Sequence, residues 1–296
     1  MPTTPLQISY VDPDGTEWNL TDYSASDGFV CSGITGIEGL PVAMQTIPLL
    51  DGSAYPNYYI QQPGAISMAV LLCWPSNGNE NTYYDLLDRF VRAFYTRRNE
   101  VPTPGYIVVQ RPNGTKRQVQ VYTTSGLNTP EVGIHGTVYS LTLDTPDPAW
   151  YDQQANQLLF VVPNSPGILP LLPVQLSSSY IIGDSNIYIN SGASCYPQWT
   201  LSGPGTPTMT NHTTGRSWSL NTSIPAGHIV QVVTKPGQQS VVDVTSSNSM
   251  WDNLVLSGAR DLWTLVPGLN QITVAMAGAT LATTVGLTWR NRWFRA

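Results

Sequence analysis

The chain has few charged residues. Asp, Glu, Lys and Arg make up 11% of its 296 residues, against roughly a quarter in ordinary soluble domains. Its polar surface must therefore come mainly from Thr, Ser, Asn and Gln, and a surface poor in charge is weakly defended against association. This favours a protein that assembles, although a β-protein with neutral loops would have the same composition. The net charge of −6 and the scattered basic residues argue against nucleic acid as a partner.

Cysteine is scarce, and long apolar runs are missing. The three cysteines, Cys31, Cys73 and Cys195, are an odd and widely spaced set, which predicts neither a disulfide framework nor a zinc site. No apolar run approaches the ~20 residues that a membrane-crossing helix needs. Residues 1–5 lack the basic region and apolar stretch of a secretory signal. We therefore expect synthesis in a reducing cytoplasm and no insertion into a membrane.

Residue patterns that signal catalysis are also missing. The chain has three histidines, His135, His212 and His228. They share no short spacing, and none has a Cys or a carboxylate at an offset typical of metal ligands. The sequence contains no Gly-x-Ser-x-Gly motif. We expect no enzyme activity, no metal and no cofactor.

Three acids lie close together in the sequence: Asp144, Asp147 and Asp152. A pair of carboxylates could serve glycoside hydrolysis, but that chemistry needs a fixed separation across a substrate cleft. A loop broken by Pro146 and Pro148 does not supply this by itself. Turn and cap roles for these acids are favoured, and a hydrolase that depends on Asp147 remains an alternative.

One segment, residues 82–98, is predicted to form a substantial helix. Thr82 and Asp85 have the spacing of a capping box at its start. Apolar residues at i, i+3, i+4 and i+7 form one stripe: Leu87, Phe90, Val91 and Phe94. Arg97 and Arg98 are placed where the helix dipole favours cations.

The rest of the first half is predicted to be strands and turns. Residues 12–15 and 112–115 have the Pro, Asn, Asp and Gly content of hairpin turns. The glycine-containing segment 27–54 is interpreted as a long loop with tight bends, and long ordered loops in compact domains are often binding elements.

The second half reads as short strands separated by turns, with no helix, which indicates a β-sandwich. A proline-rich segment precedes it. The expected organisation is therefore mainly β: a domain over residues 1–155 that includes the helix, a linker over 156–175, and a second domain over 176–296.

Taken in order, several of these segments resemble the distal tail proteins (Dit-like minor tail proteins) of long-tailed siphophages, in the form found in phages of actinobacteria. The matching segments of the first half are residues 33–41, 51–53, 83–90, 110–115, 141–143 and 146–152. Those of the second half are residues 199–205, 211–215, 217–220 and 267–270. The similarity spans nearly the whole chain and depends on the order and spacing of motifs that recur widely one by one.

The resemblance implies a β-barrel-like N-terminal domain with one α-helix and a galectin-like C-terminal β-sandwich. Members of the family form a hexameric ring at the distal end of the tail in the virion. That ring connects the tail tube protein to the baseplate, to the tail-tip hub and to tape-measure or receptor-binding proteins. A tail-tube subunit is the nearest alternative within the structural class.

Segment 27–54 and its flanking strands are expected to reach the neighbouring subunit of such a ring, where closure would hide strand edges. The candidate interface residues are Phe29, Ile34, Ile37, Leu40, Ile47, Asp51, Ser53 and Tyr55.

A carbohydrate-binding accessory protein is an alternative of another class, in which the C-terminal sandwich recognises cell-wall glycans. Trp251 and Trp263 flank a loop rich in Asn and Gly and could contact a glycan or a partner, or belong to the core. Trp218 and Trp289 lie on alternating strands and are assigned to the core. The aromatic and cationic residues of segment 289–295 fit a protein interface or a last strand with a frayed end.

Overall fold

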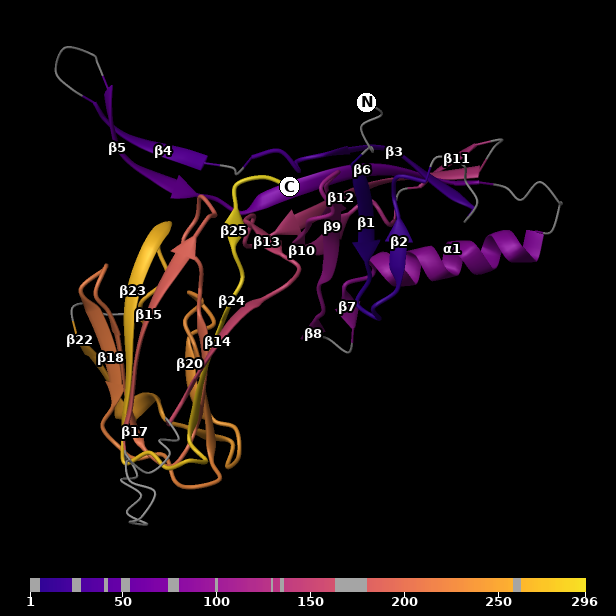
Figure 1. Cartoon of the computed structure of the whole chain (residues 1–296). Helices are drawn as coiled ribbons and strands as arrows, with labels where there is room; N and C mark the ends of the chain where they lie inside the picture. The colour runs from indigo at the N-terminus through magenta and orange to yellow at the C-terminus, as the bar shows by residue number, and fades with distance from the viewer. Residues whose placement is uncertain are drawn as a thin grey trace, which may run out of the picture. The chain divides into compact units, whose positions relative to one another are not determined.

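The computed structural model describes residues 6–22, 28–39, 42–48, 54–73, 80–98, 101–128, 130–133, 136–162, 180–257 and 262–296. Over these residues the protein is mainly β, with one α-helix (Figure 1). The chain divides into two compact units: the first is Met1–Gln153 with Trp293–Ala296, and the second is Gln154–Arg292. Within the described ranges, no helix has the length and apolar character needed to cross a membrane.

The first unit is built on a ten-stranded antiparallel sheet. Its main path runs through β2 (Glu17–Asn19), β1 (Gln7–Val11), β9 (Gly105–Gln110), β10 (Lys116–Ser125), β12 (Gly136–Thr145), β6 (Gly64–Cys73) and β3 (Phe29–Thr35). The remaining strands are β11 (Glu131–Gly133), which pairs with β12, and β13 (Trp150–Asp152), which pairs with β10 and with β25 (Arg292–Trp293). The path ends at β2 and β3 and does not close, so the described strands form an open sheet in place of a closed barrel.

Two hairpin turns follow from local side-chain chemistry. Asp12 accepts hydrogen bonds from the backbone N–H groups of Asp14 (2.9 Å) and Thr16 (2.8 Å). Gly15 has φ +86° and Gly114 has φ +83°, in the left-handed region that only Gly adopts without strain. Both hairpins predicted from the sequence are confirmed.

The helix α1 spans Glu80–Phe94, so both predicted ends are wrong. Thr82 lies inside the helix and does not cap it. Arg97 and Arg98 form β7 (Arg97–Arg98), which pairs with β8 (Val101–Pro102) in a separate two-stranded sheet. Arg97 and Arg98 are not part of the helix, because their backbones pair with β8.

The helix buries its apolar stripe against one face of the sheet. Phe90 and Phe94 are buried as predicted, and Leu87 and Val91 pack on the same core while partly exposed. The stripe also extends towards the start of the helix, because Tyr83 is buried as well.

Aromatic side chains of the sheet receive this stripe. The ring of Tyr10 stacks on Phe94 with centroids 4.2 Å apart, and its hydroxyl donates to the carbonyl oxygen of Ala93 at 3.0 Å. Phe90 lies with its ring centroid 6.0 Å from Trp18 and 5.1 Å from Tyr139. Rings of this size dominate the energetics of a core, so these contacts fix the helix on the sheet.

The described part of segment 27–54, interpreted from the sequence as an irregular loop, is largely extended. It contains β3, which pairs with β6, and β4 (Val42–Pro48), which pairs with β5 (Ala54–Gln61). The pairing of β3 shifts register between Cys31 and Gly33. Glycines at such irregularities weaken a strand pattern in the sequence, which is why the prediction was wrong.

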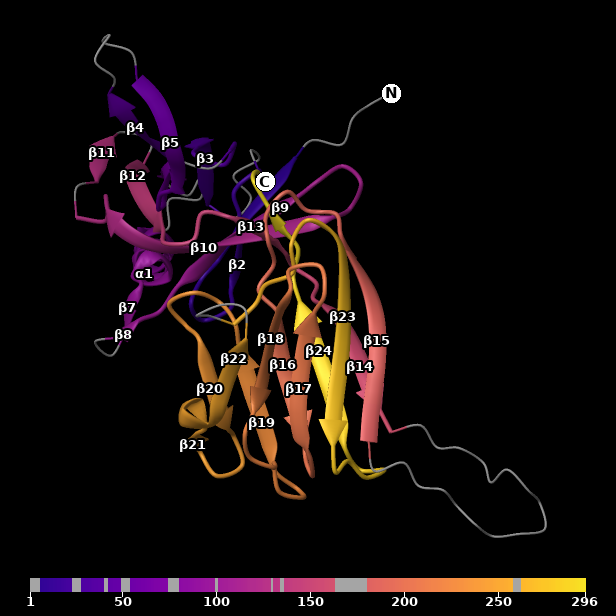
Figure 2. The same cartoon turned by 90° about the vertical axis from the view of Figure 1, so that its left-hand side faces the viewer.

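The second unit contains two antiparallel sheets (Figure 2). The six-stranded sheet has the order β14 (Asn156–Val161), β24 (Thr284–Trp289), β16 (Gln198–Ser202), β19 (Ile229–Val233), β20 (Ser240–Asp243), β21 (Asn248–Ser249). The five-stranded sheet has the order β15 (Tyr180–Ile189), β23 (Gly268–Ala277), β17 (Thr206–Asn211), β18 (Arg216–Leu220), β22 (Leu254–Ser257). A short 3-10 helix, Trp251–Asn253, precedes β22.

Buried side chains of both sheets form one hydrophobic core. Trp199 lies at its centre, with its ring 5.9 Å from Trp218 and 5.5 Å from Trp263, both in edge-to-face geometry. Sheets that share a core in this way have the layered arrangement expected from the run of short strands.

The chain crosses between the units at places that differ from the expected boundaries. Residues 156–161, expected to begin a linker, form β14 and pair with β24 over their whole length. Trp293–Ala296, expected to belong to the second domain, join the first unit. The pairing of β14 with β24 assigns residues 156–161 to the second unit, and the contacts of Trp293 assign the last residues to the first.

Candidate assembly surfaces

The two strands β4 and β5 form a ribbon of their own. Their register runs from Val42 opposite Gln61 to Pro48 opposite Ala54, with one irregularity between Gln45 and Thr46. Figure 1 shows the ribbon extending past the end of the ten-stranded sheet of the first unit. Over the described residues neither strand pairs with a third one.

Such a ribbon leaves the outer backbone groups of both strands without a partner strand. An isolated two-stranded hairpin is marginally stable in water, and unpaired edges invite association with another chain. The ribbon is therefore the element of the first unit best suited to contact another protein.

The candidate interface residues fall into four groups. Phe29 and Ile37 are buried, at 4% and 8% exposure, in the core of their own unit, so their side chains are not offered to a neighbouring subunit. Ile34 packs on that core while remaining partly exposed. Ile47 on β4 and Tyr55 on β5 are register partners across the ribbon. Leu40, Asp51 and Ser53 lie outside the described residues.

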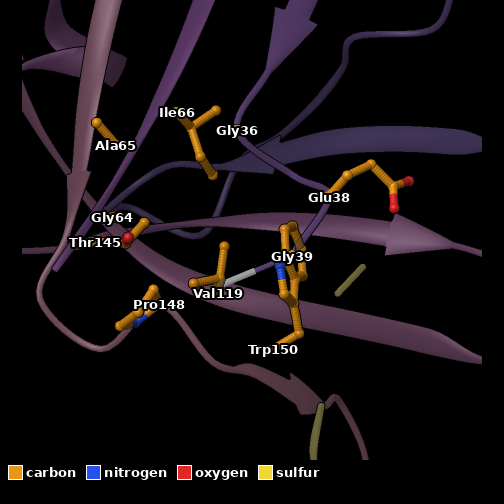
Figure 3. Close-up of a pocket in the computed structure, with 10 residues that line it drawn as sticks. All are labelled: Gly36, Glu38, Gly39, Gly64, Ala65, Ile66, Val119, Thr145, Pro148 and Trp150. Atoms are coloured by element: carbon orange, nitrogen blue, oxygen red, sulfur yellow. The ribbon is translucent and has the colours of Figure 1, made fainter. Parts of the chain in front are cut away.

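A pocket of about 260 Å³ lies beside the turn that follows β3 (Figure 3). Its walls come from the turn after β3, from the start of β6 and from β10, β12 and the β13 region: Gly36, Glu38, Gly39, Gly64, Ala65, Ile66, Val119, Thr145, Pro148 and Trp150. In Figure 3 the carboxylate of Glu38 points away from the other labelled side chains. Most of the lining residues are small or apolar.

Gly36 shapes this pocket. Its φ is +88°, and a Cβ at this position would lie 2.2 Å from the carbonyl oxygen of Ala65. Only Gly allows the backbone after β3 to pass this close to the backbone of β6.

The last residues of the chain bind to the first unit through an aromatic and cationic contact. The guanidinium of Arg117, a residue on β10 that is 5% exposed, lies 3.8 Å from the ring centroid of Trp293. Arg117 also donates to the carbonyl oxygen of Arg295 at 2.9 Å. The indole N–H of Trp293 donates to Asp152 at 2.7 Å.

Burial, followed by the charge of Arg111, lowers the pKa of Arg117 to about 10, against the opposing effect of Asp152. Arg117 therefore stays charged at neutral pH. Segment 289–295 was interpreted either as a protein interface or as a last strand with a frayed end. Instead, Trp293 and Arg295 contact residues of the same chain.

The tryptophans of the second unit fall into buried and exposed positions. Trp263 is 1% exposed, and its indole N–H donates to the carbonyl oxygen of Met209 at 3.2 Å. It belongs to the core, so the prediction of a glycan or partner contact at Trp263 is wrong. Trp251 is 41% exposed and remains accessible. Trp218 is buried, and Trp289 packs on the core while partly exposed.

The two histidines in the described part of the chain have separate environments, and His135 lies outside it. His228 contacts Asp243 through Nδ1 at 2.6 Å. This hydrogen bond, together with those from Ser246 and Thr245, lowers the pKa of Asp243 to about 2. Asp243 thereby ties the start of β19 to the turn after β20.

The other histidine, His212, lies in a polar pocket of about 280 Å³ on the five-stranded sheet. The pocket is lined by Asp184, Ser185, Asn186, His212, Gln271, Ile272 and Thr273. Sequence reasoning missed this cluster because its members come from β15, from β23 and from the turn after β17, which are far apart in the chain. The alternation of polar residues at 184 and 186 was the only local signal.

No group of three or more His, Cys, Asp or Glu side chains that could hold a metal ion is present among the residues that the structure describes. All three cysteines are free thiols, and Cys31 and Cys195 are buried. Burial raises the pKa of the Cys31 thiol, which disfavours the reactive thiolate. Asp147, the acid that an alternative hydrolase would need, accepts hydrogen bonds from the backbone of Ala149 and from the hydroxyl of Tyr151.

Comparison with known proteins finds similarity at the level of structure. No protein-family model and no curated protein sequence matches the chain. The crystal structure of the Dit protein of phage SPP1, described as a paradigm of the hub adsorption apparatus in phages that infect Gram-positive bacteria, matches with a TM-score of 0.62. The two sequences are 11% identical, and the match covers 98% of this chain and 99% of the SPP1 protein.

Structures of the phage P2 baseplate in its activated conformation match as well. The calcium form has a TM-score of 0.56 at 10% identity, and the strontium form has a TM-score of 0.51 at 9% identity. Each match covers 97% of this chain and 98% of the other. Over nearly its whole length, the chain therefore has the Dit-like fold of phage tail hub proteins.

Proposed function

We propose that this protein is a structural subunit of the tail tip of a long-tailed phage. In this proposal it is a distal tail protein that forms a hexameric ring between the tail tube and the baseplate. The observation that carries the proposal is the match to SPP1 Dit over 98% of the chain, which includes both units and their order. A match of this coverage involves residues of both units and is not confined to one of them.

The ribbon of β4 and β5 supports an assembling role. Its edges have no partner strand among the described residues, and ring closure would give them one without leaving an open end. Ile34, Leu40, Ile47, Asp51, Ser53 and Tyr55 remain the proposed interface residues. An obligate contact of this kind buries ~2,000 Å² or more.

The proposed place of the ring, between the tail tube and the baseplate, also defines its partners. The ring would contact the tail tube protein on one side and tail-tip hub, tape-measure or receptor-binding proteins on the other, at the distal end of the tail. The role is structural and requires no catalysis. The first unit would form the ring, and the second unit would be a galectin-like domain.

The mass of the purified protein in solution tests this proposal. Multi-angle light scattering should give six times 32.3 kDa, and negative-stain images should show rings with six-fold symmetry. Ile47→Lys should reduce the mass to that of the single chain, because a charge buried at an interface without a partner opposes association.

Val255→Lys is the matched control. Val255 is 47% exposed on β22 of the second unit, so the same substitution there should leave the ring intact. A monomer at high concentration, or equal disruption by both substitutions, would contradict the proposed ring.

A further inference from the structure

The strand β14 forms an edge of the six-stranded sheet that the hub role does not use. It pairs with β24 over its whole length and with no other strand among those that the structure describes. Figure 2 shows β14 next to β15 at one margin of the second unit. Every second residue of an antiparallel edge strand directs its N–H and C=O groups away from its only neighbour. On that side, the backbone of β14 has no partner strand in the described part of the chain.

The residues of β14 lack the features that usually protect an edge. Natural edge strands are very short, or they carry charges, prolines or bulges. The sequence of β14, NQLLFV, contains no charged residue, no Pro and no Gly, and its register with β24 is uninterrupted. In contrast, the edge strand β3 shifts register, and the edge strand β15 carries the exposed carboxylate of Asp184. The edge of β14 is therefore open to pairing with another strand.

Apolar side chains stand on both faces of β14. Leu159 and Val161 point to the outer face and are 68% and 50% exposed. Leu158 and Phe160 lie on the opposite face, where they pack on the core while partly exposed. A strand added beside β14 would meet apolar neighbours on both of its faces, and strands covered on both faces are rich in apolar residues throughout.

The surroundings of Leu159 are also free of charge. The row that starts at Leu159 continues across the outer face of the sheet with Gly286, Thr200, Gln231 and Val242. Each of these residues is neutral, and Gly286 leaves the position next to Leu159 without a side chain. A neutral added strand fits this face, because a charged one would lose hydration and gain no opposite charge.

The neighbouring strand β15 argues against a second copy of this protein as the added strand. The ring of Phe160 lies so close to Gly183 that a Cβ at Gly183 would collide with it, so β15 runs alongside β14. A second copy paired edge to edge would bring its own β15, and therefore its own Asp184, to the same margin. Like charges brought together in this way are unfavourable. A single extended segment carries no second sheet and avoids this repulsion.

We infer that β14 accepts a β-strand from another protein. The segment that it binds is extended, uncharged and apolar on both faces. Backbone hydrogen bonds to the free side of β14 supply affinity, and contacts with Leu159 and Val161 select apolar side chains. The inference goes beyond the hub role and does not depend on ring formation.

Binding of a synthetic strand by the full-length protein is the test. The probe is a short acetylated and amidated peptide in which Val and Thr alternate. Titration calorimetry measures its affinity, and hydrogen exchange of residues 156–161 locates it. We expect submillimolar binding and slower exchange in β14. The same peptide with every backbone nitrogen methylated should not bind, because it has no N–H groups to donate.

Leu159→Asp should weaken binding of the peptide about tenfold or more, because a charge on an edge strand opposes pairing. Val255→Asp is the matched control. Val255 is 47% exposed on β22, the strand at the end of the five-stranded sheet, and this change should leave the affinity as it is. Both side chains are exposed, so neither change should alter the unfolding temperature, and thermal unfolding separates lost binding from lost folding.

Three results would overturn the inference: no binding of the peptide at millimolar concentration, equal binding of the methylated peptide, or binding that Val255→Asp abolishes and Leu159→Asp keeps. A second copy is the occupant, and the inference is wrong, if Ile47→Lys scatters as a pair of chains and adding Leu159→Asp makes it a single chain. Light scattering of the wild type reports the ring, so failure of strand binding and failure of the proposed assembly are measured separately.

Discussion

Replacing Trp293 with Ala tests whether the end of the chain stabilises the first unit. Trp293 covers the guanidinium of Arg117 at 3.8 Å and donates from its indole to Asp152 at 2.7 Å. The substitution removes both interactions and exposes a side chain, Arg117, that is only 5% exposed.

The expected loss follows from the two contacts. A cation–π contact with a desolvated guanidinium is worth about 2 kcal/mol, and a hydrogen bond to a charged group contributes about 1.5–3 kcal/mol. Because the contacts share one ring and are not additive, we expect a loss of about 3 kcal/mol in the free energy of unfolding of the first unit. For a unit of this size, 1 kcal/mol shifts the unfolding temperature by about 2–4 °C, so a decrease of about 6–12 °C is expected.

Differential scanning calorimetry measures the change, and hydrogen exchange of β10 and β13 assigns it to the first unit. Trp251→Ala is the control, because Trp251 is 41% exposed and the substitution removes a ring of the same size from the surface. It should shift the unfolding temperature little.

A decrease for Trp293→Ala no larger than that of the control would refute the reasoning. A double-mutant cycle with Arg117→Met adds a sharper test. If the two substitutions add within about 0.5 kcal/mol, the ring and the guanidinium do not interact energetically.

Two further predictions concern the hydrogen bonds of two buried side chains. The pKa of Asp243 is lowered to about 2 from 3.8 by its hydrogen bonds, first that with His228. The ionised carboxylate therefore contributes on the order of 2 kcal/mol to the free energy of unfolding above about pH 4, and this contribution is lost as the pH falls towards 2. Acid unfolding should show less pH dependence in Asp243→Asn. An unchanged acid profile would contradict this. Tyr10→Phe removes the hydroxyl bonded to the carbonyl oxygen of Ala93 and should cost about 1–3 kcal/mol in urea unfolding while the ring contacts persist, whereas an unchanged midpoint would show that this carbonyl finds another donor.

Local chemistry explains why some elements were predictable. Asp12 and Gly15 complete a turn with their own neighbours, so nothing distant is needed. The apolar stripe of Phe90 and Phe94 follows from helical periodicity. The C-terminal end of the same helix was mispredicted, because β7 and β8 pair through backbone groups that carry no side-chain signal.

The candidate surfaces depended more on distant contacts. Phe29 and Ile37 were assigned to an interface because segment 27–54 was expected to reach a neighbouring subunit, yet both are buried in the core of their own unit. Trp263 is equally apolar in sequence terms, and its bond to Met209 makes it a core residue. The burial of an apolar residue is decided by what folds over it, and sequence spacing does not report that.

By itself, the amino-acid sequence determined the hairpin turns, the presence of one amphipathic helix, the β-rich character of both halves and the shortage of charge, because each follows from residues within a few positions of one another. Only the tertiary structure decided that β4 and β5 form a separate ribbon, that Trp293 returns to Arg117, and that Asp184, His212 and Thr273 meet in one pocket. These outcomes join residues up to 176 positions apart, and such contacts exist only after strand pairing and packing have selected one register from many.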